Sequence, residues 1–188
     1  MGSLTREQIL EKAAKGEKFN GVDLTEADLS YANIKGADFS GAVLKKAHFQ
    51  NANLEGADFS GADLEKVFFF GANLKNAKFK NANLTEVNLQ DCNLEGADLS
   101  GTDLSGVSLF GANLDNANLK DAVLKKVKLK RASLAGANLQ NADLSGAHLQ
   151  RAVLKNADLT GAVCTDAKMH NADLTGAKYN PDDLKDCL

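Results

Sequence analysis

The chain has 188 residues, a formal net charge of −3 at pH 7 and a sequence pI near 5.6. This balance favours neither bulk binding to nucleic acid nor a strongly anionic surface. The single proline and the absence of any apolar run near the roughly 20 residues that cross a bilayer exclude a proline-rich linker protein and a membrane-spanning segment. No signal segment opens the chain, so we expect one soluble domain in the cytoplasm.

Residues 1–18 predict an N-terminal capping helix. Thr5 is the expected N-cap, and Gln8 completes a capping box three residues later. Ile9 begins an apolar stripe, and Gly16 is the expected stop signal. A solenoid has an open end whose core would meet water, so we expect this helix to cover that end. A helix that binds a partner is the alternative.

From residue 19 to residue 181 the sequence repeats every five residues, as in Ala52-Asn53-Leu54-Glu55-Gly56. The central position, i, is Leu in 23 of the 31 repeats between residues 22 and 176, and Phe in five more. In a helix, successive central residues would advance by roughly 140° and leave no core stripe. In an alternating strand, every second one would face solvent. Each repeat is therefore predicted to be a short extended piece followed by a turn.

Glycine and asparagine show where the turn lies and how many repeats close one coil. Fourteen of the 16 glycines stand at position i+2, and seven more i+2 residues are Asn. Both residue types tolerate a positive φ, so i+2 is the predicted corner. Aromatic residues recur at intervals of 20, at Phe19, Phe39, Phe59 and Phe79. Stacked residues are constrained together, so four repeats are predicted to make one coil, with about eight coils in all.

The tandem A-[D/N]-L-x-x motif over residues 19–181 resembles the signature of the pentapeptide repeat proteins. The resemblance implies an all-β fold, a right-handed quadrilateral β-helix in which positions i and i−2 face inward. It also implies that Asp or Asn at i−1 helps to satisfy backbone groups near the corners. Many members of that family have no assigned function, some protect DNA gyrase by mimicking DNA, and many come from cyanobacteria. Residues 182–188, after Asn180 and Pro181, predict a short helical C-terminal cap.

One of the four predicted sides departs from the repeat. We name each side by its first inward residue: the Leu24, Leu29, Ile34 and Phe39 sides. On the Leu29 side, position i−1 is Asp or Asn in two of eight coils, against five or six on each of the others. Leu and Ala fill the interior and leave no pocket there, so any function must lie on an outer side. The Leu29 side is the one predicted to carry it.

Two zones on the Leu29 side are candidate partner-binding surfaces. The aromatic patch consists of Phe68, Phe70 and Phe110, which are predicted to face solvent. The basic patch consists of Lys128, Lys130, Arg131, His148, Arg151, Lys168 and His170. It could meet an acidic partner surface or phosphates. The alternatives are tolerated surface apolar residues or self-association for the aromatic patch, and ordinary solvated charges for the basic patch.

No catalytic, cofactor or metal site is predicted. His148 and His170 lie on adjacent coils, but no Asp, Glu or Cys joins them on that side. The repeat uses its glycines as corners, and it shows no nucleophile and base set. Cys164 occupies an inward position and is expected to pack there, and a disulfide to Cys187 is the alternative.

We therefore expect a non-enzymatic scaffold that presents the Leu29 side to an unidentified protein partner, with no cofactor, as a monomer or weak homodimer. Nucleic acid and membrane are not expected ligands. A DNA mimic that acts on gyrase is the first alternative, and it needs a long acidic face. Residues 1–100 carry 11 basic and 15 acidic residues, which is close to neutral. A structural rod with no specific ligand is the second alternative.

Overall fold

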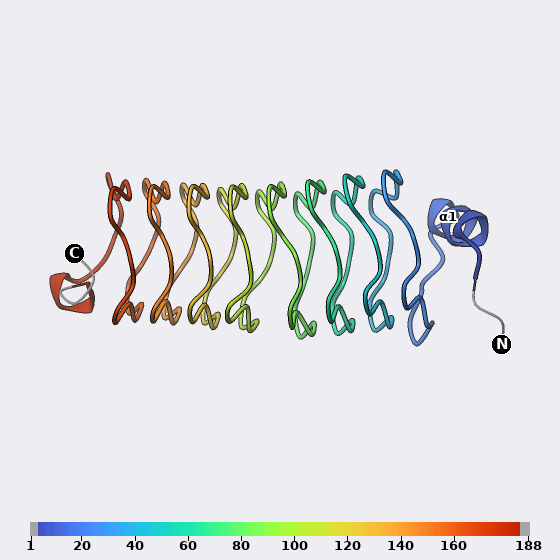
Figure 1. The fold of residues 1–188 in the computed structure, drawn as a ribbon, viewed down its shortest axis with the longest axis horizontal. Helices are drawn as coiled ribbons and strands as arrows, with labels where there is room; N and C mark the ends of the chain where they lie inside the picture. Colours follow the sequence, from blue (N-terminus) through green and yellow to red (C-terminus); the bar gives the residue numbers. More distant parts are fainter. Residues whose placement is uncertain (1–3, 185–188) are drawn as a thin grey trace.

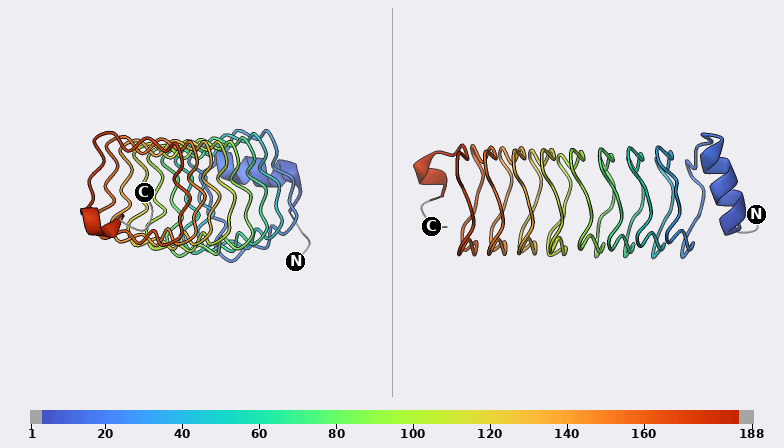
Figure 2. Two further views of the ribbon diagram at one scale, coloured as in Figure 1. Left: turned by 60° about the vertical axis from the view of Figure 1, so that its left-hand side comes forward. Right: turned by 90° about the horizontal axis from the view of Figure 1, so that it is seen from above.

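The computed structural model describes residues 4–184, and they form an elongated rod of stacked coils (Figure 1). Helix α1 (Arg6–Ala14) lies at one end, and the short 3-10 helix η1 (Pro181–Asp183) lies at the other. Two further views show the coils following one another along a single axis (Figure 2). The chain therefore advances steadily along the rod, and residues about 20 apart in sequence become neighbours.

The β-structure consists of parallel bridges between i−1 residues that are 20 apart, such as Asn33 with Asn53 and Asn53 with Asn73. The residues that the structure describes form no longer strand. Each bridge is held by main-chain hydrogen bonds between coils; the Leu54 N–H donates to the Asn73 carbonyl at 2.7 Å. Every side of the rod is thus a ladder of one-residue strands, and repeats of five residues put four sides in each coil.

Position i+2 is the corner of the coil, as predicted. Gly56 has a φ of +69°, and non-glycine residues at the same position take a similar conformation, with φ of +59° at Lys66 and +62° at Arg131. The left-handed region costs an ordinary residue about 1–2 kcal/mol. The hydrogen-bonded coils above and below fix the corner, so the repeat tolerates charged residues there.

The interior is a dry column of central residues lined by alanine. Phe39, Phe59 and Phe79 are fully buried, and so are Leu54 and Ala57. The rings of Phe39 and Phe59 stack with their centroids 5.4 Å apart, and those of Phe59 and Phe79 do the same. Small alanines at i−2 leave room for these larger side chains in a narrow tube.

Asp and Asn at i−1 satisfy main-chain groups beside the corners, as the family resemblance implied. The Ser40 N–H donates to Asp38 Oδ1 at 3.1 Å, and the same bond recurs along the Leu24, Ile34 and Phe39 sides. On the Ile34 side the asparagines also join one another. Asn53 Nδ2 donates to Asn33 Oδ1 at 3.0 Å, and Asn73 Nδ2 donates to Asn53 Oδ1 at 3.1 Å.

The two ends are covered by helical segments. The Thr5 side chain accepts the Gln8 N–H, and the Gln8 side chain accepts the Thr5 N–H, which together make a capping box at the start of α1. Ile9 is buried against the first coil, and Arg6 donates to the Asp28 carbonyl at 2.6 Å. At the other end Leu184 is buried. The rest of the predicted C-terminal cap, residues 185–188, lies outside the described residues.

The coil stack opens at one place on the Leu24 side. Within residues 18–178, Asn83 and Asp103 are the one stacked pair of i−1 residues that forms no bridge. The Leu84 N–H has no bond to the Asp103 carbonyl, whereas the equivalent Leu64 N–H donates to the Asn83 carbonyl at 2.9 Å. The coils are visibly further apart here, in the green part of the rod (Figure 1). We call this opening the coil gap.

A change in core packing accompanies the coil gap. Stacked phenylalanine rings lie up to 5.4 Å apart, which exceeds the roughly 4.8 Å between neighbouring strands. The phenylalanine column ends at Phe79 and continues as Leu99, and Thr102 replaces the usual alanine beside it. The Thr102 hydroxyl donates to the Leu99 carbonyl at 2.7 Å. The step from Phe79 to Leu99 keeps its own bridge, between Lys78 and Asp98, so the opening lies on the side next to this change in the core.

Candidate functional site

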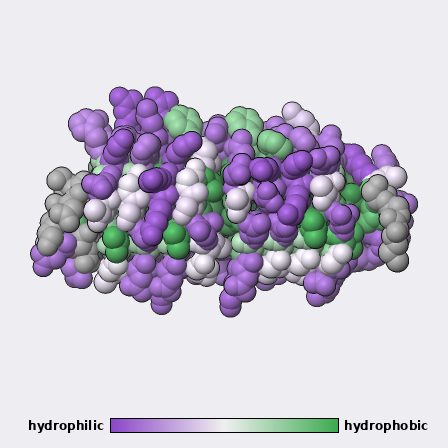
Figure 3. Space-filling model, turned by 60° about the horizontal axis from the view of Figure 1, so that its bottom comes forward, coloured by the Kyte–Doolittle hydropathy of each residue, from purple (hydrophilic) through white to green (hydrophobic). Residues whose placement is uncertain are grey.

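The aromatic patch lies on the Leu29 side with its rings partly in solvent. Phe68, Phe70 and Phe110 are 38%, 43% and 36% exposed, which confirms that they point outward. The ring of His48 stacks on Phe68 with the centroids 4.9 Å apart. Hydrophobic residues form small, separate groups on the mainly hydrophilic face in Figure 3. A patch of this size suits a local contact rather than an extensive apolar interface.

The basic patch carries charges that the protein itself does not neutralise. Its lysines and arginines are exposed, and they form no salt bridge with any described residue; they are Lys128, Lys130, Arg131, Arg151 and Lys168. Elsewhere, cations pair across coils: Lys45 Nζ lies 2.9 Å from Glu65, and Lys75 Nζ lies 3.1 Å from Glu95. The Leu29 side therefore presents free positive charge in the second half of the rod.

A shallow hollow of about 350 Å³ joins the two patches. It is lined by Gln90, Ser108, Phe110, Lys128, Lys130, His148 and Gln150. Four of the ten predicted residues thus line one hollow: Phe110, Lys128, Lys130 and His148. The other six lie outside it; they are Phe68, Phe70, Arg131, Arg151, Lys168 and His170. The Gln150 Oε1 atom is buried and lacks a hydrogen-bond partner among the described residues.

The same side leaves a column of main-chain donors without acceptors. On the other sides, the i+1 N–H donates to the residue at i−1 in most coils where that residue is Asp or Asn, as Ser100 does to Asp98 at 3.1 Å, and it lacks this acceptor where i−1 is Val or Lys, as at Lys125 and Lys80. Lys128 and His148 occupy i−1 here and cannot play that part. No described residue accepts the i+1 N–H groups of Phe110, Lys130, Gln150 and His170. The basic patch therefore offers neutral N–H donors as well as cations, an arrangement suited to negatively charged oxygen atoms.

Neither a reactive cysteine nor a cluster of metal ligands is found among the described residues. Burial raises the pKa of the Cys92 thiol to about 12, and its S–H donates to the Phe69 carbonyl at 2.9 Å. Such a thiol is unreactive. No group of three or more potential metal ligands occurs among residues 4–184. Cys164 is disulfide-bonded rather than a packed free thiol, and its suggested partner, Cys187, lies outside the described residues.

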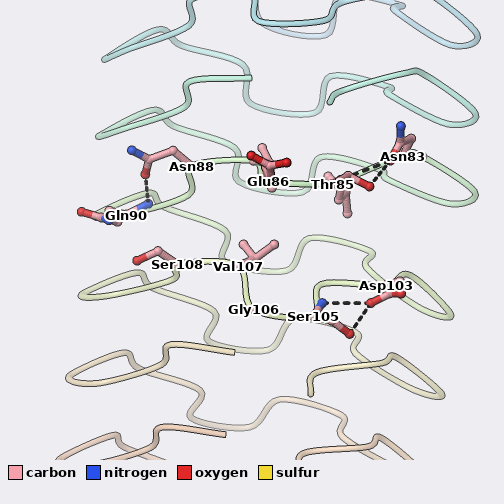
Figure 4. Close-up of a pocket in the computed structure, with 13 residues that line it drawn as sticks. Asn83, Thr85, Glu86, Asn88, Gln90, Asp103, Ser105, Gly106, Val107 and Ser108 are labelled. Atoms are coloured by element: carbon pink, nitrogen blue, oxygen red, sulfur yellow. Dashed lines mark hydrogen bonds between the residues drawn. The ribbon is translucent and has the colours of Figure 1, made fainter. Parts of the chain in front are cut away.

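The coil gap forms a second surface hollow, of about 640 Å³, on the neighbouring Leu24 side. Figure 4 shows Asn83, Thr85 and Glu86 on one coil facing Asp103 and Ser105 on the next. The side chains mostly bond within their own coil. The Thr85 hydroxyl donates to Asn83 at 2.7 Å, and the Ser105 hydroxyl donates to Asp103 at 2.6 Å. The hollow thus has a mixed lining of polar side chains and apolar residues such as Leu84, Val87 and Val107, and no group placed for catalysis.

Models of known families match most of the repeat. A model of pentapeptide repeats matches residues 18–45, 37–76 and 137–176, and a model of a pentapeptide repeat region matches residues 63–139. The chain belongs to the pentapeptide repeat family. The fold of this family is the right-handed quadrilateral β-helix, in agreement with the four-sided coils described above. Neither matching model describes a catalytic family.

Solved pentapeptide repeat proteins resemble this chain. HetL, involved in heterocyst differentiation regulation in the cyanobacterium Nostoc, is 30% identical; the alignment covers 96% of this chain and 98% of HetL, with a TM-score of 0.49. A trypsin-treated form of QnrB1, a plasmid-mediated fluoroquinolone resistance protein, is 18% identical; its alignment covers 85% of this chain and 92% of QnrB1, with a TM-score of 0.53. The likeness to QnrB1 concerns the fold. A comparison with curated proteins found no match.

Some features of this pentapeptide repeat protein could not be read from the sequence pattern. Gln150 was overlooked because glutamine is common at exposed i+1 positions, and its buried oxygen depends on the packing around it. The coil gap falls in an unbroken run of repeats, so the five-residue motif does not predict it. The exception at Thr102 and the end of the phenylalanine column were the available signals.

None of the helices among residues 4–184 is long and apolar enough to cross a membrane.

Proposed function

We propose that this pentapeptide repeat protein is a non-enzymatic scaffold whose Leu29 side binds a protein partner. The observation that carries the proposal is the unpaired charge of the basic patch, because the rod neutralises many of its other cations across coils. Exposed Phe110 and the cations Lys128 and Lys130 share one hollow, which combines an aromatic anchor with charge. Aromatic and basic side chains together are typical of protein interfaces.

The ends of the rod complete this proposal. We also propose that helix α1 and residues 182–184, the described part of the predicted C-terminal cap, cover the ends of a β-helix of about eight coils, with residues 19–181 as the repeat. Covered ends hide the unpaired edges that would otherwise join rods end to end. The scaffold then acts as a monomer or weak homodimer through its side, not its ends.

A DNA mimic that acts on gyrase has less support. Such a mimic needs a continuous acidic face, and the aspartates here have other roles. Asp38 and Asp58 accept hydrogen bonds from their own corners and lie within 4 Å of Lys18 and Lys78. Their charge is therefore partly neutralised. Absence of gyrase protection in a supercoiling assay at micromolar protein would agree with this ranking.

Charge reversal tests the scaffold proposal directly. A variant with Lys128→Glu, Lys130→Glu and Arg131→Glu should capture partner from a lysate of the source cells at least about tenfold less well than the unaltered protein, because close opposite charges across an interface become like charges. Quantitative mass spectrometry of the captured proteins gives the readout.

The matched control reverses exposed, unpaired lysines on the Phe39 side, Lys80→Glu and Lys120→Glu. It should leave capture unchanged. A second test variant, Phe70→Ala with Phe110→Ala, removes the aromatic anchors and should weaken capture in the same direction. Equal capture by the charge-reversed protein and by its control would exclude the Leu29 side as the binding surface.

A further inference from the structure

The Leu29 side differs from the other three sides in the chemistry of its corners as well as in its charge. On the Phe39 side Asp98 accepts the Ser100 N–H, and on the Ile34 side Asn93 accepts the Glu95 N–H at 3.1 Å. In the basic patch the corresponding N–H groups of Lys130 and Gln150 have no acceptor among the described residues. Among the described residues, the Leu29 side is thus the one that lacks this oxygen atom in four successive coils, from Phe110 to His170.

We propose that an acidic peptide segment of the partner supplies these missing oxygens. Carboxylates of the segment accept the i+1 N–H groups, as the repeat's own aspartates do elsewhere, and the unpaired lysines and arginines neutralise them. This identification rests on the scaffold function proposed above, and it specifies the chemical nature of the partner.

The hollow favours a peptide over a phosphate polymer. The partly exposed ring of Phe110 lines it beside Lys128 and Lys130, and a peptide can bring an apolar side chain to that ring as well as carboxylates to the lysines. An inorganic phosphate chain carries no apolar group.

The geometry also sets the length of the segment. The free N–H groups from Phe110 to His170 span three coil steps, which at roughly 4.8 Å each is about 14 Å. An extended chain rises about 3.3 Å per residue, so about five residues cover the column. Phe110 lies at one end of this span, where an apolar residue flanking the acidic segment would contact its ring.

A synthetic octa-aspartate peptide with a fluorescent label is a suitable probe, since it contains the proposed chemistry and no other recognition element. Its fluorescence anisotropy on titration with the full chain at low salt should rise and saturate. An increase in salt should weaken the binding, because part of the attraction is between exposed charges.

Two substitutions at one position separate charge from main-chain donors. Lys128→Ala removes the positive charge alone and should weaken binding about fivefold, the effect of roughly 1 kcal/mol. Lys128→Asn also removes the charge, but it restores the repeat residue, whose side-chain oxygen accepts the Lys130 N–H. It should therefore weaken binding clearly more than alanine, about 25-fold. Because asparagine is the usual residue at i−1, this variant should fold, which thermal unfolding can verify.

The matched control is Lys78→Asn, the same substitution at the same repeat position on the Phe39 side, and it should leave affinity unchanged. Equal losses for Lys128→Ala and Lys128→Asn would overturn the role of the main-chain donors. Tighter binding of a labelled oligothymidylate than of octa-aspartate would overturn the choice of carboxylate. If octa-aspartate does not bind although charge reversal still abolishes partner capture, the acidic segment is wrong and the scaffold function stands.

Discussion

The residue at i−1 determines whether the main-chain N–H at i+1 is hydrogen-bonded within its own coil or has no acceptor there. Where it is Asp or Asn, its side chain bonds the main chain two residues later, as Asp158 does with the Thr160 N–H at 3.1 Å. Where it is Lys or His on the Leu29 side, that bond is missing. The residue type at this one position of the repeat therefore determines whether the N–H at i+1 stabilises the corner or is available to bind a ligand.

The aspartates at i−1 predict how stability depends on pH. Hydrogen bonds from the side chains of Ser40, Thr160 and Thr175 hold the pKa values of Asp38, Asp158 and Asp173 below their ordinary value of 3.8. The folded state thus prefers the ionised carboxylates. Their contribution is complete above pH of about 4, the pKa in the unfolded chain, and is lost as pH falls through the lower folded values.

The guanidinium chloride concentration at the midpoint of unfolding, measured from pH 7 down to pH 2, should therefore stay high above about pH 4 and decrease at lower pH. Asp158→Asn keeps an acceptor for the Thr160 N–H but cannot titrate, so its midpoint should depend less steeply on pH than that of the unaltered chain. An unchanged pH dependence in this variant would show that the Asp158 hydrogen bonds do not contribute in the way described.

At the scale of elements, the coils are uniform except where the core changes. The five-residue period predicted the inward central residues, the Gly and Asn residues predicted the i+2 corners, and the phenylalanines spaced by 20 predicted the stacking, because each reflects a local rule that recurs from coil to coil. The opening between Asn83 and Asp103 depends on how unlike coils fit together. The repeats around Leu84 and Leu104 keep the five-residue period, and only the stacked structure shows the opening between them.

The same contrast applies to the candidate site. Phe70 and Phe110 could be placed on the surface because the period fixes which residues face outward, and their exposure confirms this. The hollow that joins Phe110 to Lys128 and His148 could not be predicted, since it depends on side-chain conformations across three coils. The pairing of charges could not be predicted either: Lys125, close to the basic patch in sequence, lies 3.2 Å from Asp143 and forms a salt bridge with it.

The coil gap predicts a local pattern of amide hydrogen exchange. The N–H groups of Leu84 and Glu86 lack the inter-coil bonds made by their counterparts Leu64 and Lys66, so they should exchange at least about tenfold faster under native conditions. Residue-resolved NMR exchange gives the comparison within one sample. Equal protection of Leu84 and Leu64 would mean that the ladder is closed in solution.

At the scale of the whole molecule, charge is distributed unevenly along the rod. In the first half, cations and anions pair between coils, as with Lys35 and Glu55 at 3.0 Å and Lys66 and Glu86 at 3.6 Å. In the second half, the Leu29 side keeps its cations unpaired. Exposed ion pairs add little stability. The more important consequence of this uneven pairing is that the basic patch keeps positive charge that a partner can neutralise.

Site-specific photo-cross-linking tests this account most directly. A photoreactive phenylalanine analogue at position 110, in the hollow on the Leu29 side, should form a covalent adduct with the partner, and Lys128→Glu with Lys130→Glu should abolish it. The same analogue in place of Lys120, on the Phe39 side, should give no adduct. Cross-linking from position 120 but not from position 110 would contradict the claim that the Leu29 side carries the function.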